Sequence, residues 1–107
     1  MNTPSPLVAI IGAGSIGVAF AIVFARAGWR VRLQDPDTRR LQLAHEEINS
    51  RCVELQHYGL LQETPETLNA RVELCSDLAS AVAGARLIQE CAPERLELKI
   101  ELFRQLD

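Results

Sequence analysis

The chain has 107 residues, of which 48% are hydrophobic and 23% are charged. This length suits one compact domain with a single core, and the composition excludes disordered, collagen-like and coiled-coil chains. The formal net charge is −3 and the lysines and arginines are scattered, so nucleic acid is not expected as a partner.

The first apolar stretch, residues 7–25, carries no charge, so a signal peptide and a membrane span both have to be considered. The six residues before it contain two prolines and no lysine or arginine, whereas a signal peptide begins with a positively charged segment. Three glycines also interrupt the stretch, where a spanning helix would be continuous. We therefore expect a buried strand followed by a buried helix, and no contact with a membrane.

The first three predicted elements follow from hydrophobic patterning. Leu7 to Ile11 is a continuous apolar run, typical of a parallel strand that is covered on both faces. Ile16 to Ala27 is apolar nearly all round and is followed by Gly28, which predicts a mostly buried helix that ends at this glycine. Trp29 to Gln34 alternates apolar and polar residues, so a second strand is expected nearer an edge of the sheet than the first.

A long amphipathic helix is predicted after the Asp-Pro-Asp break at residues 35–37, because proline suits a first helical turn. We expect it to run to about Tyr58 and to end at Gly59. Its apolar residues recur at spacings of three and four, and they are Leu41, Ala44, Ile48, Cys52 and Leu55.

The next part of the chain is less regular. Leu60 to Ala70 contains a proline and is expected to be a loop or a broken helical turn. Val72 to Cys75 is predicted to be a short strand. A short helix is predicted at Leu78 to Ala83, with Asp77 as its N-cap and Gly84 after its end.

The last predicted elements are a strand at Leu87 to Ala92, broken by Pro93, and a helix that runs to the end of the chain. Leu96, Ile100 and Phe103 form the apolar stripe of that helix. Strands therefore alternate with helices throughout. This order predicts an α/β fold of the doubly wound Rossmann type, with a parallel sheet and helices on both faces.

Residues 12–17 read Gly-Ala-Gly-Ser-Ile-Gly, a GxGxxG motif that follows a buried strand and opens a helix. Gly12 permits a tight turn, Gly14 lets the backbone approach a pyrophosphate, and Gly17 lets the helix pack closely. The unpaired N–H groups of Ser15, Ile16 and Gly17 would then face the phosphates, and the helix dipole favours their negative charge. A glycine turn without ligand is the alternative, but it needs fewer glycines.

Asp35 ends the second predicted strand, 18 residues after the last glycine of the motif. Its carboxylate can accept hydrogen bonds from both hydroxyls of an adenine ribose, and its charge would repel a 2′-phosphate. NAD is therefore expected rather than NADP. The alternative is an ordinary turn or helix-capping aspartate. Arg39 and Arg40 are expected on a solvated helix face rather than at a 2′-phosphate.

With these motifs and the segment Leu-Ile-Gln-Glu-Cys-Ala-Pro-Glu-Arg-Leu-Glu-Leu-Lys at residues 87–99, the sequence resembles the NAD-binding domain of the L-3-hydroxyacyl-CoA dehydrogenase family. The resemblance covers residues 7–107. The segments Ile-Gln-Glu-Cys at residues 88–91 and Leu-Phe-Arg-Gln-Leu-Asp at residues 102–107 are most similar to the branch of this family that contains lambda-crystallin and L-gulonate 3-dehydrogenase. The resemblance implies hydride transfer from a 3-hydroxy group to NAD, in fatty acid metabolism. A cytoplasmic location is expected from the cysteines, which are odd in number and share no CxxC spacing.

The resemblance also implies roles for individual residues. Glu94 and Lys99 match family positions beside the cofactor on its nicotinamide side, although by themselves they are also compatible with a first-turn glutamate and a helix-face lysine. The family's catalytic histidine and its supporting glutamate come from sequence later than Asp107. We therefore assign no catalytic residue here, expect the chain alone to be inactive, and expect His45 and His57 at the surface.

The resemblance further implies that residues 1–107 are one NAD-binding domain, whose substrate and dimerisation domain is not part of this chain. A hydroxyacyl substrate and a homodimer are then expected of the full-length protein. Residues 56–71 stand where some family members have a long insertion.

The alternative function is a non-catalytic module, either nucleotide-sensing or crystallin-like, that binds NAD without turnover. No metal site is expected, and the three cysteines are expected to be reduced core thiols.

Overall fold

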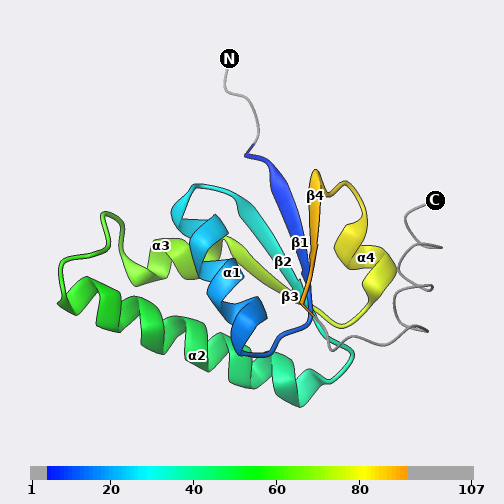
Figure 1. Cartoon of the computed structure of the whole chain (residues 1–107), viewed down its shortest axis with the longest axis horizontal. Coiled ribbons are helices and arrows are strands. Elements are labelled where there is room, and N and C mark those ends of the chain that lie inside the picture. The colour runs from blue at the N-terminus through cyan, green and yellow to red at the C-terminus, as the bar shows by residue number, and fades with distance from the viewer. Residues whose placement is uncertain (1–4, 92–107) are drawn as a thin grey trace.

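The computed structural model describes residues 5–91, in which strands alternate with helices as the sequence predicts, except that two helices stand between the second and third strands (Figure 1). In chain order they are β1 (Leu7–Ile11), α1 (Ser15–Arg26), β2 (Arg30–Gln34), α2 (Thr38–His57), α3 (Pro65–Ala70), β3 (Val72–Cys75), α4 (Leu78–Val82) and β4 (Leu87–Glu90). The predicted break at Pro93 and the predicted last helix lie outside the described residues.

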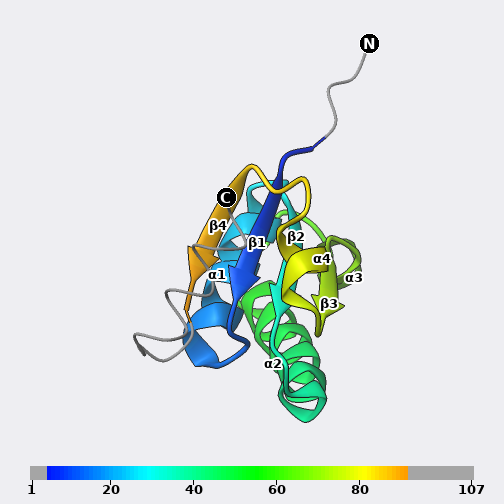
Figure 2. The ribbon, with the colours of Figure 1, turned by 90° about the vertical axis from the view of Figure 1, so that its right-hand side faces the viewer.

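The four strands form one parallel sheet in the order β3-β2-β1-β4. The chain moves from β1 outward through β2 to β3, and then returns to the other side of β1 to form β4. The side on which successive strands are added therefore reverses between β1 and β4. Open α/β sheets bind ligands at this switch point. Helices α1 and α2 lie on one side of the sheet and α4 on the other (Figure 1; Figure 2).

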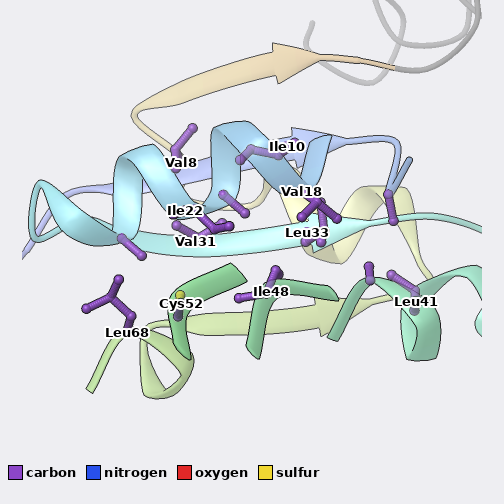
Figure 3. Packing of buried hydrophobic residues seen from close by; sticks show 14 residues of the cluster. Val8, Ile10, Val18, Ile22, Val31, Leu33, Leu41, Ile48, Cys52 and Leu68 are labelled. Carbon is purple, nitrogen blue, oxygen red and sulfur yellow. The ribbon is translucent and has the colours of Figure 1, made fainter. Parts of the chain in front are cut away.

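β1 is buried along its whole length, because both faces of the sheet are covered. On one face, Val8 and Ile10 pack with Leu33 of β2 and with α1 and α2 (Figure 3). On the other face, Ala9 and Ile11 pack with residues of α4. The predicted two-sided burial of this strand is therefore confirmed, and β1 provides a rigid support for the turn that follows it.

The uncharged stretch at residues 7–25 consists of β1, the glycine loop and most of α1, as predicted. The prediction that α1 is mostly buried is wrong for the described residues, since Ile16 and Val23 are exposed on the face turned away from the sheet and α2. α1 has 12 residues and is followed by Gly28, whose φ is +91°, so the predicted left-handed end of this helix is confirmed. Among the helices at residues 5–91, none is long and apolar enough to cross a membrane.

β2 lies between β1 and β3, and β1 lies between β2 and β4, so within residues 5–91 each is one strand from an edge and the predicted difference between them is not seen. Two of the polar residues of β2, Arg32 and Gln34, have partners in the protein, whereas Arg30 is exposed. Arg32 donates from Nη1 to the carbonyl oxygens of Ser80 (2.9 Å) and Ala83 (2.7 Å) at the end of α4. Gln34 is buried and donates from Nε2 to the carbonyl oxygen of Ser76 (3.0 Å). Polar alternation here therefore reflects satisfied contacts under α4.

The segment predicted as a loop or broken turn contains a regular six-residue helix, α3. Thr64 begins it, since its Oγ1 accepts a hydrogen bond from the N–H of Thr67 (3.2 Å), and Pro65 stands in the first turn, where its missing N–H costs nothing. Leu68 is fully buried in the core and anchors the helix. The proline therefore starts a helix rather than breaking one.

The three cysteines are free, but only Cys52 is a core residue. Burial raises the pKa of its thiol. Cys75 and Cys91 are only partly buried, because Cys75 ends β3 and Cys91 follows β4, the two short outer strands of the described sheet. Burial, followed by the nearby charge of Glu90, raises the pKa of the Cys91 thiol. The expectation of three core thiols is therefore correct for one of them.

The C-terminal end of α1 is held by contacts on both sides of α3, with Leu60 before it and Arg71 after it. Arg71 donates from Nη1 to the carbonyl oxygen of Ala25 (2.7 Å), and both of its terminal nitrogens bind the carboxylate of Glu63 (2.7 and 2.6 Å). Arg26 donates to the carbonyl oxygen of Leu60 (3.0 Å). The hydrogen bonds from Arg71 lower the pKa of the Glu63 carboxyl. These contacts satisfy a terminal carbonyl of α1 and fix its distal end.

We expect Glu63→Gln to lower stability at neutral pH and to have a smaller effect in acid. Because the pKa of Glu63 is lower in the folded state than in the unfolded state, its contribution is fully present above the unfolded value of about 4.3. It is lost as the pH falls through the lowered folded pKa. The urea midpoint of both proteins, measured from neutral to acidic pH, tests this.

The matched control is Glu46→Gln, which removes an exposed α2 carboxylate that has no ion pair among residues 5–91. Equal urea midpoints for Glu63→Gln and the control at neutral pH would contradict the role of the Glu63–Arg71 pair.

Candidate dinucleotide-binding site

The glycine loop, residues 12–14, joins β1 to α1 at the carboxyl end of the sheet. Its first N–H, that of Gly12, donates to the carbonyl oxygen of Gln34 at the end of β2 (2.7 Å). On the other side of β1, the N–H of Cys91 after β4 donates to the carbonyl oxygen of Ile11 (2.7 Å). The loop therefore begins where the order of the strands reverses, between the ends of β2 and β4.

The three glycines of the motif meet different constraints. Gly12 has φ of +105°, which a residue with a side chain rarely adopts, as its predicted role in a tight turn requires. A Cβ on Gly17 would lie 1.9 Å from the carbonyl oxygen of Gly12, so this glycine is needed for close packing of α1 against the loop. Both of these requirements come from the fold itself.

Gly14 is required by neither backbone conformation nor packing. Its φ of −77° and ψ of −171° are open to other residues, and a Cβ on it would meet no protein atom within 4 Å. The space beside Gly14 is therefore open, on the side from which a ligand would approach the start of α1. The geometry agrees with the predicted approach of a pyrophosphate to this backbone position.

The N-terminus of α1 has no side-chain cap, because Gly14 occupies the N-cap position. The first helical hydrogen bond runs from the N–H of Val18 to the carbonyl oxygen of Gly14 (2.9 Å), which leaves the N–H groups of Ser15, Ile16 and Gly17 without helical acceptors. In the described part of the chain, the other helices are each capped by a side chain, namely Asp37, Thr64 and Asp77. α1 thus offers donors and a positive dipole end to an anion.

The carboxylate of Asp35 lies directly beside the glycine loop. Its Oδ2 accepts a hydrogen bond from the N–H of Ala13 (3.1 Å), and its Oδ1 accepts one from the N–H of Asp37 (2.9 Å). The backbone N–H of Asp35 donates to the carbonyl oxygen of Cys75 on β3 (3.1 Å). The cap of α2 is Asp37 rather than Asp35, so the helix-capping alternative for Asp35 is wrong. The alternative of a turn aspartate is correct, since Asp35 accepts from the N–H of Asp37. Asp35 also contacts the glycine loop.

The other residues considered from the sequence are not gathered at the loop. Arg39 and Arg40 are exposed in the first turn of α2, and their N–H groups bind the Oδ1 of Asp37 (3.0 and 3.3 Å). His45 and His57 are exposed on α2, as expected. Glu94 and Lys99 lie outside the described residues, so their contacts with a cofactor stay predictions. Across residues 5–91, no cluster of histidine, cysteine and acidic side chains is suited to a metal ion.

Sequence reasoning missed Glu90, which ends β4 in register with Ile11 of β1. Its Oε1 is buried and has no hydrogen-bond partner among residues 5–91. A carboxylate at the end of an otherwise uncharged strand was the available clue, since such ends line the ligand crevice of a parallel sheet. Glu90 therefore belongs with Asp35 among the acidic groups at this edge of the sheet.

Two cavities lined by residues within 5–91 lie away from the loop. One, of about 430 Å³, lies between the distal end of α1 and the segment before α3, where Val23 and Leu60 line it. The other, of about 400 Å³, lies between α1 and α2 and is lined by Ile22, Leu55 and Tyr58. The chemistry of the glycine loop, with its free N–H donors and adjacent carboxylate, identifies the candidate site better than cavity size does.

Comparison with known proteins identifies what this arrangement is similar to. The family model described as "3-hydroxyacyl-CoA dehydrogenase, NAD binding domain" matches residues 7–107. Lambda-crystallin from Oryctolagus cuniculus is 40% identical over 102 residues, which are 94% of this chain and 32% of that protein. L-carnitine dehydrogenase/betainyl-CoA thioesterase from Ruegeria pomeroyi is 37% identical over 98 residues, which are 92% of this chain and 20% of that protein.

The fold has a close counterpart among solved structures. 3-Hydroxybutyryl-CoA dehydrogenase from Escherichia coli K12 superimposes with a TM-score of 0.86 and 36% identity, over 97% of this chain and 22% of that one. The chain thus spans about a third or less of the length of these relatives. The likeness concerns the nucleotide-binding part of larger proteins.

We expect Gly14→Val to abolish detectable NADH binding while the fold is kept. The side chain would fill the space that the pyrophosphate needs, but it would start in a position free of protein atoms. NADH titration by fluorescence and circular dichroism of the variant test the two halves of this expectation. Unchanged affinity in a folded Gly14→Val protein would show that the phosphates do not approach this loop.

Proposed function

The chain belongs to the family of 3-hydroxyacyl-CoA dehydrogenase NAD-binding domains, and on this premise we propose that it serves an enzyme that transfers a hydride from a 3-hydroxy group to NAD. The substrate class we propose is a hydroxyacyl-CoA or a small hydroxy acid. Relatives named L-carnitine dehydrogenase and 3-hydroxybutyryl-CoA dehydrogenase support this class. The nicotinamide supplies the redox chemistry, and this chain binds and orients the cofactor.

The observation that carries the proposal is the open, uncapped start of α1 beside Gly14. We assign the pyrophosphate to the free N–H groups of Ser15, Ile16 and Gly17, where it would receive hydrogen bonds and the favourable dipole of α1. Asp35 lies on the β2 side of the loop, so the adenine ribose belongs there. The nicotinamide half then extends across the switch point toward β4.

The remaining parts of the proposed function fall to residues beyond the described range. Glu94 and Lys99 follow β4 in the sequence, and we assign them to the nicotinamide side of the cofactor. The proton acceptor, the walls around a hydroxyacyl substrate and a homodimer contact belong, in this proposal, to the larger protein. A cytoplasmic location and a place in fatty acid metabolism complete the proposal, which rests on the family of the chain and its unpaired cysteines.

A second function is favoured by one specific finding, the 40% identity to lambda-crystallin. Under this alternative the domain binds NAD in a sensing or structural protein without turnover. The glycine loop and Asp35 serve both functions equally well, because cofactor binding is common to both. A catalytic histidine with a supporting glutamate in the larger protein would distinguish the enzyme from the structural protein.

We expect the chain to bind NADH in preference to NADPH. The Asp35 carboxylate can accept hydrogen bonds from the ribose hydroxyls and would repel a 2′-phosphate. Asp35→Ala should weaken NADH binding by about 1.5 to 3 kcal/mol, the range for hydrogen bonds to a charged group, and should weaken NADPH binding much less. Isothermal titration of both nucleotides with both proteins measures this. Equal or reversed affinities of the unmodified chain would overturn the assignment to NAD.

We also expect the 107-residue chain alone to show no dehydrogenase activity, even when NAD is bound. A positioned base contributes about 10² to 10⁴ in rate, and both histidines of the chain lie exposed on α2. NADH formation with 3-hydroxybutyryl-CoA and with L-gulonate is the measurement. Turnover approaching about 1 s⁻¹ would reveal an unrecognised catalytic group, and Glu94 and Lys99 would be the first residues to replace.

A further inference from the structure

We propose that Asp35 is a positioning residue that holds the glycine loop in its binding conformation before any nucleotide arrives, an inference that rests on the proposed binding of NAD. This role is separate from contact with the ribose. It follows from where the backbone hydrogen bonds between β1 and β2 stop.

The ordinary backbone pairing between these strands ends at the first residue of the loop. The N–H of Gly12 still donates to a backbone carbonyl, that of Gln34 (2.7 Å). The next N–H, that of Ala13, donates to the Oδ2 of Asp35 instead (3.1 Å). Ala13 is only 2% exposed, so water is a poor substitute for this acceptor. Without the carboxylate, a nearly buried N–H group would lose its partner.

The same carboxylate holds a second segment. Its Oδ1 accepts from the N–H of Asp37 (2.9 Å), and the side chain of Asp37 caps α2 by accepting from the N–H of Arg39 (3.0 Å). The backbone N–H of Asp35 is itself bound to Cys75 of β3 (3.1 Å). One side chain therefore links the glycine loop, the end of β2 and the start of α2.

An isolated turn aspartate would make only the short-range contact to Asp37. The contact to Ala13 instead joins residues that are 22 positions apart in the sequence and that follow two neighbouring strands, β1 and β2. It fixes the residue between Gly12 and Gly14, just before the N–H groups that we assign to the pyrophosphate. Loss of Asp35 should therefore affect the loop even in the absence of ligand.

Positioning the loop and binding the ribose are compatible. An ionised carboxylate offers about four acceptor sites on its two oxygens. The N–H groups of Ala13 and Asp37 use one site on each oxygen, which leaves one on each for a ribose diol. Binding of NAD then requires no rearrangement of Asp35, and the loop does not have to be ordered when the nucleotide arrives.

Amide hydrogen exchange of the nucleotide-free 107-residue chain tests the positioning role without any ligand. In Asp35→Ala, we expect the Ala13 amide to exchange about tenfold faster or more, since a hydrogen bond to a charged group is lost. Asp37→Asn is the control, because it removes a nearby charge and asparagine is also a good N-cap. Unchanged exchange at Ala13 in a folded Asp35→Ala protein would overturn the proposal.

Asp35→Asn keeps the size of the side chain and serves if Asp35→Ala does not fold. The N–H groups of Ala13 and Asp37 bind different oxygens of Asp35, and asparagine replaces one of these oxygens with an NH2 group, which cannot accept. The amide of either Ala13 or Asp37 should therefore exchange faster than in the unmodified chain. Protection of both amides at the original level would contradict the role of the carboxylate.

Binding of ADP and of 2′,3′-dideoxy-ADP separates loop positioning from ribose contact. If Asp35 contacts only the ribose, Asp35→Asn should bind dideoxy-ADP as tightly as the charge-matched Asp37→Asn does. With loop positioning, we expect Asp35→Asn to bind dideoxy-ADP about threefold or more weakly than the control, since part of a hydrogen-bond contribution is lost. Equal affinities would overturn the proposal. Failure of the unmodified chain to bind NADH or ADP would overturn the proposed function instead, whatever the amide exchange shows.

Discussion

The close packing of α1 against the turn after β1 is the constraint on which the rest of the site depends. At Gly17 there is no room for a side chain, because a Cβ would lie 1.9 Å from the carbonyl oxygen of Gly12. This contact fixes the start of α1 over the carboxyl end of β1, where the order of the strands reverses. The free N–H groups of the first turn are thereby directed into the crevice at the switch point. A small shift of the helix would misplace all of them together.

Stability and ligand recognition are divided between the two ends of α1. The distal end is fastened by Arg71, which binds both the carbonyl oxygen of Ala25 and the carboxylate of Glu63. The N-terminal end has no side-chain cap, in contrast to the other helices at residues 5–91. An uncapped helix end lacks a contribution of roughly 1 kcal/mol that a capping side chain provides. Here an anionic ligand can take the place of that cap.

The acidic residue after β2 connects this helix end to the sheet. Asp35 accepts hydrogen bonds from Ala13 in the loop and from Asp37 before α2, while its own backbone is bound to β3. The carboxylate therefore joins the glycine loop to the start of α2, and the backbone of the same residue joins them to β3. Pre-ordering of a binding loop lowers the conformational entropy that ligand binding has to overcome. The domain thus contributes preorganisation as well as contacts to a cofactor.

The sequence by itself determined the alternation of strands and helices, the buried character of β1, and the glycine motif followed by Asp35, because hydrophobic periodicity and glycine spacing are local properties. Only the tertiary structure decided that β2 pairs with strands on both sides, and that Arg32 and Gln34 find partners near the distant α4. It also decided that Gly14 alone of the three glycines is free of protein constraints, and that Asp35 reaches Ala13. Both depend on distances between segments that no local pattern encodes.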